Sequence, residues 1–77
     1  MKELDSLLRA VELAGGQSAL ARKCNPHAKR KVTQQDVWSW IHRSKRVAGD
    51  MAIPVELATG VSRHELRGDL YPAEQIA

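Results

Sequence analysis

Apolar residues recur every three or four positions along the first part of this chain, which is the spacing of one buried helix face. The pattern predicts a first helix from about Glu3 to Ala14, where Gly15-Gly16 supply a left-handed cap. Its apolar positions are Leu4, Leu7, Leu8 and Val11. A second helix is predicted over residues 17–24, with Leu20, Ala21 and Cys24 inward, until Asn25-Pro26 disfavours continuation.

The next helical segment carries its own start signal. Thr33 can cap the first turn, and Asp36 three residues later has the position of a capping-box partner. The helix is therefore predicted to begin near Gln34. On a helical projection, one face holds Val37, Trp40 and Ile41, and the other holds Gln35, Ser39 and His42.

The polar face of this segment has the chemistry of a base-reading surface. A glutamine amide can bond both the acceptor and the donor that adenine shows in the major groove, and a serine hydroxyl can bond several base edges. Gln34 and Gln35 are therefore the main candidates for base readout, and Thr33, Ser39 and His42 are further candidates for contact with DNA. The alternative is a solvated helix face that contacts nothing.

Two further helices are predicted after Gly49. The first ends at Thr59-Gly60, tolerates Pro54 in its first turn, and contains Met51, Ile53, Val55, Leu57 and Ala58. The second starts at Ser62, which has capping-box spacing to Glu65, and runs through Leu66. No strand pattern, repeat or linker is found. Residues 1–77 are expected to form one all-α domain, a compact bundle of about five short helices.

Length and composition limit the function classes. A chain of 77 residues with 43% hydrophobic and 27% charged residues fits a small folded domain with a limited core of its own. One cysteine cannot form an internal disulfide, and neither a signal segment nor a membrane-spanning run is recognised. The expected location is therefore a reducing cytoplasm.

The positive charge is unevenly placed, although the net charge is only +3. Basic residues flank the third helix on both sides: Lys29, Arg30 and Lys31 before it, and Arg43, Lys45 and Arg46 after it. This placement predicts contacts with DNA phosphates. The alternative is an ordinary solvated charge run.

The two tryptophans receive different interpretations. Trp40 shares the apolar face and is expected in the core. Trp38 lies at the boundary of that face, where it could pack under the basic loop, stack at the DNA surface or lie in a partner interface.

At several points the sequence resembles the Cro/cI-like helix-turn-helix regulators, and more narrowly the YdaS-type, Cro-like antitoxins and repressors of prophages. The matching segments are Gly15 to Ala21, Thr33-Gln34-Gln35 with Val37 and Trp40, Ala58-Thr59-Gly60, His64 to Arg67, and Asp69 to Pro72. The resemblance covers nearly the whole chain. It implies a lambda-repressor-like DNA-binding domain containing a helix-turn-helix, in a bacterial or phage-encoded protein associated with the nucleoid.

The resemblance also implies roles for individual residues. Gln17 would brace the DNA backbone, and Gln34 and Gln35 would enter the major groove. The sequence departs from the family pattern in two places. The segment from residue 25 to residue 31 is longer than the usual tight turn, and Asp36 replaces what is commonly a small residue, so the angle between the two helices is left open.

The sequence contains no residue pattern that is typical of a catalytic site or of a metal site. A zinc site built from Cys24, His27, His42 and His64 would lack the paired close spacing of zinc modules. Nucleophile, base and orienting residue do not occur as a set, and no glycine loop is suited to phosphate. We expect neither an enzyme nor a cofactor.

The expected function is sequence-specific binding to double-stranded operator DNA by a phage or prophage regulator that represses transcription. A pseudo-palindromic operator would need a homodimer. Its contact is expected in residues 66–77, from Leu66, Leu70, Tyr71 and Ile76, although packing of this segment on the core is the alternative. Two other functions remain open: an antitoxin that also binds a toxin, and a helical protein-interaction module without DNA binding.

Overall fold

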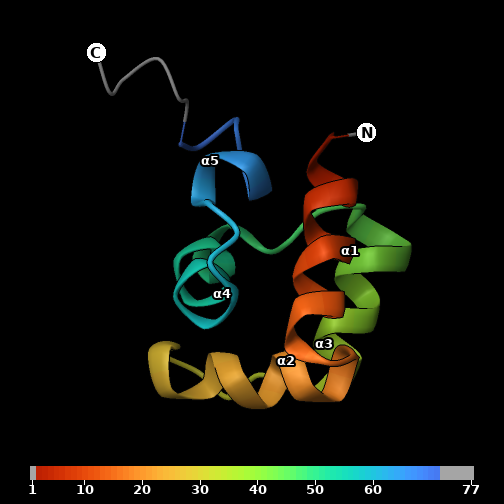
Figure 1. The fold of residues 1–77 in the computed structure, drawn as a ribbon, viewed down its shortest axis with the longest axis vertical. Coiled ribbons are helices and arrows are strands. Elements are labelled where there is room, and N and C mark those ends of the chain that lie inside the picture. Colours follow the sequence, from red (N-terminus) through yellow and green to blue (C-terminus); the bar gives the residue numbers. More distant parts are fainter. Residues whose placement is uncertain (1, 72–77) are drawn as a thin grey trace.

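The computed structural model describes residues 2–71, and within this range the chain is entirely helical, with no strand (Figure 1). The α-helices are α1 (Lys2–Ala14), α2 (Gln17–Cys24), α3 (Gln34–Ser39), α4 (Ala52–Thr59) and α5 (Arg63–Leu66). Two 3-10 turns, η1 (Asn25–His27) and η3 (Gly49–Met51), and one π-helical turn, η2 (Trp40–Ser44), connect or extend them. The prediction of an all-α bundle of about five short helices is confirmed.

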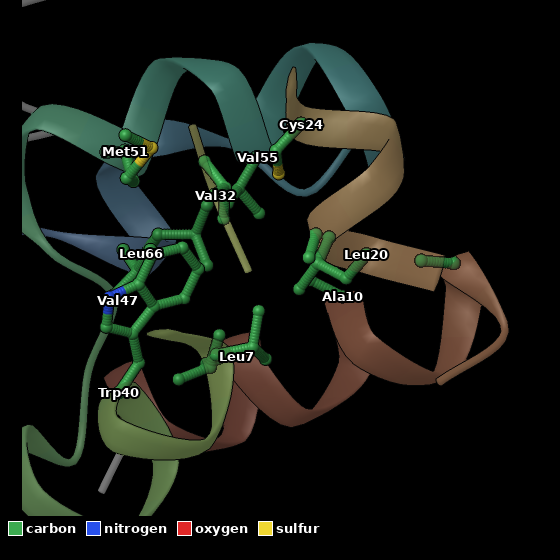
Figure 2. Packing of buried hydrophobic residues seen from close by; sticks show 14 of the residues in the cluster. Leu7, Ala10, Leu20, Cys24, Val32, Trp40, Val47, Met51, Val55 and Leu66 are labelled. Atoms are coloured by element: carbon green, nitrogen blue, oxygen red, sulfur yellow. The ribbon is translucent and has the colours of Figure 1, made fainter. Parts of the chain in front are cut away.

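The helices surround one core. In Figure 1, α2 runs across the bottom of the molecule, α1 and α3 stand on one side, and α4 and α5 stand on the other. Side chains from every layer meet between them, as Figure 2 shows for Leu7, Leu20, Trp40, Val55 and Leu66. Ala21 is buried as well, and its small side chain allows α2 to approach its neighbours closely.

Glycines end two of the helices. Gly15 and Gly16 have φ angles of 99° and 121°, and their N–H groups donate to the Val11 carbonyl at 3.1 and 2.9 Å. Gly60, at a φ of 85°, ends α4 in the same left-handed region. These stops are as predicted, because only a residue without a Cβ adopts such angles at little cost.

Leu8 does not lie in the core. It is 44% exposed, whereas Leu7, Ala10 and Ala14 of the same helix are buried. The buried stripe of α1 is therefore narrower than the apolar pattern predicted, since the spacing from Leu7 to Ala10 to Ala14 already fills the face toward α2, α4 and α5.

The long turn between α2 and α3 is closed by one side chain. Asn25 Oδ1 accepts the Val32 N–H at 2.8 Å, and Asn25 Nδ2 donates to the Val32 carbonyl at 3.0 Å and to the Ala21 carbonyl at 2.9 Å. The side-chain amide thereby satisfies both backbone groups of a buried residue. This contact fixes where the chain re-enters the fold before α3, which the sequence left open.

Two expectations for the C-terminal part are wrong. Leu66 is fully buried, so it belongs to the core and cannot form a dimer contact. The Ser62–Glu65 capping box does not form either: the Ser62 hydroxyl contacts the Glu65 carboxylate at 3.3 Å, and that carboxylate binds Arg9 at 3.0 Å. Leu70 is exposed, Tyr71 is half-buried against the core, and Ile76 lies outside the described residues.

Candidate nucleic-acid interface

The start of α3 is fixed by a capping box. The Thr33 hydroxyl accepts the Asp36 N–H at 3.3 Å, and the Asp36 carboxylate accepts the Thr33 N–H at 2.9 Å. Two orphan donors of the first turn are satisfied in this way, and the Asp36 charge lies where the helix dipole favours it. The predicted helix start is therefore confirmed, and the side chains of Gln34 and Gln35 leave from a defined backbone.

A glutamine pair joins the first residues of α2 and α3. Gln34 Nε2 donates to Gln17 Oε1 at 2.6 Å, and the exposed Gln34 keeps its own carbonyl oxygen available. Gln35 is also exposed, and within residues 2–71 its amide has no hydrogen-bond partner. The structure thus joins two of the three glutamines that the sequence selected, Gln17 and Gln34, and leaves Gln35 exposed.

Beyond Ser39 the helix widens into the π-helical turn η2, which the periodicity did not predict. Trp40 is buried and Ile41 packs against the core, as expected. The turn ends at Lys45, a non-glycine residue with a φ of 62°. His42 and Arg43 are exposed, whereas Ser39 is half-buried and contributes less to the polar face than predicted.

Trp38 lies on the outer side of α3. Its side chain is 36% exposed, and its ring stacks on His42 with 4.5 Å between ring centroids and 34° between planes. Offset or tilted aromatic pairs at this separation are attractive. Trp38 therefore has an ordered orientation although it lies outside the core.

The basic loop before α3 contains two kinds of cation. Arg30 binds Asp50 at 3.1 Å and lies 3.9 Å from Asp36, and the hydrogen bond that Arg30 donates to the Asp50 carboxylate raises the pKa of Arg30. Lys29 and Lys31 are exposed and form no ion pair within the described part of the chain. An anion would therefore bind Lys29 or Lys31 without breaking an ion pair, whereas binding to Arg30 would require the loss of its pair with Asp50.

The cations after α3 divide in the same way. Arg43 and Lys45 are exposed without an ion pair among residues 2–71. Arg46 lies 3.5 Å from both Glu3 and Asp69, so its predicted phosphate contact competes with two carboxylates.

Arg67 binds the segment of the chain that follows Lys45. Arg67 donates to the Val47 carbonyl at 3.1 Å and binds Asp69 through two hydrogen bonds, of 3.0 and 2.8 Å. The hydrogen bonds from Arg67, aided by its charge and that of Arg46, lower the pKa of Asp69 to about 2. No sequence pattern pointed to this cluster. It holds the segment after α3 against the C-terminal part of the fold.

The remaining candidate groups are the Cys24 thiol and the three histidines. Cys24 is buried, and desolvation raises the pKa of its thiol to about 11, so the thiol stays neutral at neutral pH. Among residues 2–71, histidine, cysteine and carboxylate side chains do not gather in a group of three that could hold a metal ion. Within the same range, no helix has the length and apolar character needed to span a bilayer.

Comparison with known proteins gives one match. Residues 7–75 match the family model described as bacterial toxin YdaS. No curated protein and no solved structure matches the chain. The matched range contains α2, α3 and the connection between them in full.

Proposed function

The chain belongs to the YdaS family, and we propose that it acts as a sequence-specific DNA-binding protein that represses or otherwise regulates transcription in a phage or prophage. In this proposal α2 and α3 are the two helices of a helix-turn-helix, and α3 is the recognition helix. Its mechanism is occupancy of an operator: a bound protein blocks access of polymerase without any chemical step.

The glutamine arrangement on α2 and α3 is the observation that carries the proposal. Gln17 and Gln34 are joined at 2.6 Å, and Gln35 is exposed beside them. A carboxamide presents a donor and an acceptor side by side, which is the pattern needed for two bonds to adenine in the major groove. Orientation by a neighbouring side chain reduces the conformational entropy lost on binding.

The charge distribution around α3 supports the same surface. Lys29 and Lys31 lie before the helix and Arg43 and Lys45 after it, and all four are exposed. Cations at these places would contact phosphates on either side of the groove into which α3 is inserted, and would set the register of the helix. Three carboxylates of this region are each engaged by an arginine: Asp36 and Asp50 by Arg30, and Asp69 by Arg67.

A homodimer remains part of the proposal, because a two-fold operator requires a two-fold reader. Leu70 belongs to the predicted contact segment and is exposed, so its side chain is available for a dimer contact. Sedimentation of the full chain and of Leu70→Ser, with and without operator DNA, tests this part. A wild-type chain that stays monomeric on DNA would refute the dimer, but not DNA binding itself.

The second candidate function is action through a protein partner in a toxin–antitoxin system. The description of the matched family as a bacterial toxin favours it. An antitoxin that also binds a toxin keeps its DNA contacts, so substitutions of Gln34 and Gln35 should abolish its selective DNA binding and leave its binding to the toxin unchanged. A helical interaction module without DNA binding would show no selective DNA binding before or after these substitutions.

Selection of bound sequences from a random duplex pool tests the proposed function. The full chain should enrich a defined motif, and the double variant Gln34→Ala, Gln35→Ala should enrich none. Leu57→Ala is the matched control, since Leu57 is exposed on α4, outside the candidate interface, and should enrich the wild-type motif. Absence of any enriched motif with the wild-type chain would refute the proposal.

A further inference from the structure

We propose that Trp38, held by His42, is an apolar reading element that contacts the C5-methyl group of one thymine in each DNA half-site. This inference rests on the proposed DNA-binding function and adds to it a specific base contact.

The exposure of Trp38 is the first observation. The chain has two tryptophans, which lie two residues apart and differ in burial. Trp40 is 5% exposed in the core, and Trp38 is 36% exposed outside it. About a third of the Trp38 surface thus stays open to solvent on α3, and this part is available for contact with a ligand.

The stack on His42 is the second observation. With ring centroids 4.5 Å apart, the two aromatic side chains restrict each other. A large apolar side chain that is already ordered loses little entropy when it is covered. The pair thus forms a preorganised apolar surface on the exposed side of α3 and η2.

The position on the helix selects the occupant. Trp38 lies four residues after Gln34 and three after Gln35, so it follows both along the same side of α3, about one turn or ~5 Å further on. The spacing of successive bases along one strand is ~3.4 Å, so this distance corresponds to one or two base pairs beyond those that the glutamines would read.

The chemistry of the major groove identifies the group contacted. Base edges there present hydrogen-bond donors and acceptors, and the thymine methyl is the apolar group among them. The indole of Trp38 forms no hydrogen bond within residues 2–71, and its face is apolar. Stacking on a base face would need an unpaired base, whereas a methyl group is accessible in an intact duplex.

The test removes the methyl group alone. Each thymine of the selected duplex is replaced in turn by deoxyuridine, which differs only at C5, and the dissociation constant is measured at one salt concentration. For the wild-type chain, replacement at one position per half-site should weaken binding about threefold to tenfold, because burial of one methyl group has an effect of this size. For Trp38→Ala the same replacement should have no effect.

Three variants separate this contact from general damage. Trp38→Phe keeps an aromatic surface and should keep the dependence on the methyl group. Gln35→Ala should bind more weakly but with the same methyl dependence, since it leaves Trp38 in place. His42→Ala should reduce the dependence, because the stack that orders Trp38 is lost. Far-UV circular dichroism checks that each variant is folded.

The outcomes distinguish the inference from the proposed function. Selective duplex binding with equal methyl effects in the wild type and in Trp38→Ala, or with none, would overturn the thymine contact and leave DNA binding intact. Failure of the wild-type chain to bind any duplex selectively would overturn both, and a protein partner would then be the occupant of the Trp38 surface.

Discussion

Asn25 is expected to be a main determinant of stability and of the placement of α3, although it lies in a connection. Replacing it by alanine removes the three hydrogen bonds that its side chain makes, two to Val32 and one to the Ala21 carbonyl. The Ala21 carbonyl keeps the N–H of residue 25 as a partner, but Val32 loses the partner of both of its backbone groups. Val32 is 2% exposed, so water reaches these groups poorly.

The size of the effect follows from these contacts. A buried donor or acceptor left without a partner costs ~1–3 kcal/mol, so two such groups with partial relaxation cost roughly 2–4 kcal/mol. A domain of 77 residues is stable by roughly 4–12 kcal/mol in total. The expected fall in Tm is roughly 8 to 32 °C, at about 4–8 °C per kcal/mol for a domain of this size.

Urea unfolding followed by circular dichroism measures the change in free energy. Asn25→Asp should be destabilised at least as much as Asn25→Ala at neutral pH, because a carboxylate still accepts the Val32 N–H but faces two carbonyl oxygens. His27→Ala, in the same connection and exposed, is the control and should change stability by less than ~0.5 kcal/mol. A loss below ~0.5 kcal/mol for Asn25→Ala, with an unchanged denaturant slope, would refute the role given to this side chain.

Three further predictions concern charge and titration. Replacing Lys29 and Lys31 together by alanine should reduce the slope of log affinity against log salt by about two without changing the preferred sequence, whereas an unchanged slope would assign both lysines to solvent. Burial raises the pKa of the Cys24 thiol to about 11, so a thiol reagent at pH 8 should react with the folded chain far more slowly than with the chain in urea. For the same reason the free energy of unfolding should decline as pH rises from about 9 toward 11. Equal reaction rates would contradict the burial of Cys24. The arginine partners of Asp69 lower its pKa to about 2, so the stabilising contribution of this carboxylate should be present above pH ~4 and lost as pH falls through about 2. Asp69→Asn should therefore flatten the fall of the free energy of unfolding at acid pH. An unaltered fall would refute the pairing of Asp69 with the arginines.

The helix boundaries could be predicted because their signals are local. Gly15, Gly16 and Gly60 end helices at the residues where they occur, and Thr33 with Asp36 starts one. In each case the interacting groups are within five residues of each other, so the sequence alone brings them together. Because the capping box is local, the sequence alone also predicts that Gln34 and Gln35 lie in the first turn of α3.

Contacts across longer stretches of chain could not be predicted. Asn25 reaches a residue seven positions away, and Arg67 reaches the Val47 carbonyl twenty positions away. Both contacts depend on how the helices pack. Glu65 has the spacing of a capping partner for Ser62, but its carboxylate binds Arg9 of α1, because tertiary packing brings that guanidinium within 3.0 Å.

The surface roles of the cations were also only partly predictable. A run of basic residues indicates a positive surface, but the sequence does not show which of its members already have a carboxylate partner. Arg30 and Arg46 have such partners in Asp50 and in Glu3 with Asp69, whereas Lys29 and Lys31 have none within the described residues.

The ratio of affinities for the selected duplex and for a scrambled duplex, measured at one salt concentration for the wild-type chain and for Gln35→Ala, tests the central claim most directly. If α3 reads bases, Gln35→Ala should lose ~1–3 kcal/mol of binding free energy on the selected duplex and little on the scrambled one, so the ratio should fall about fivefold to 150-fold. Equal losses on both duplexes would contradict base readout by α3.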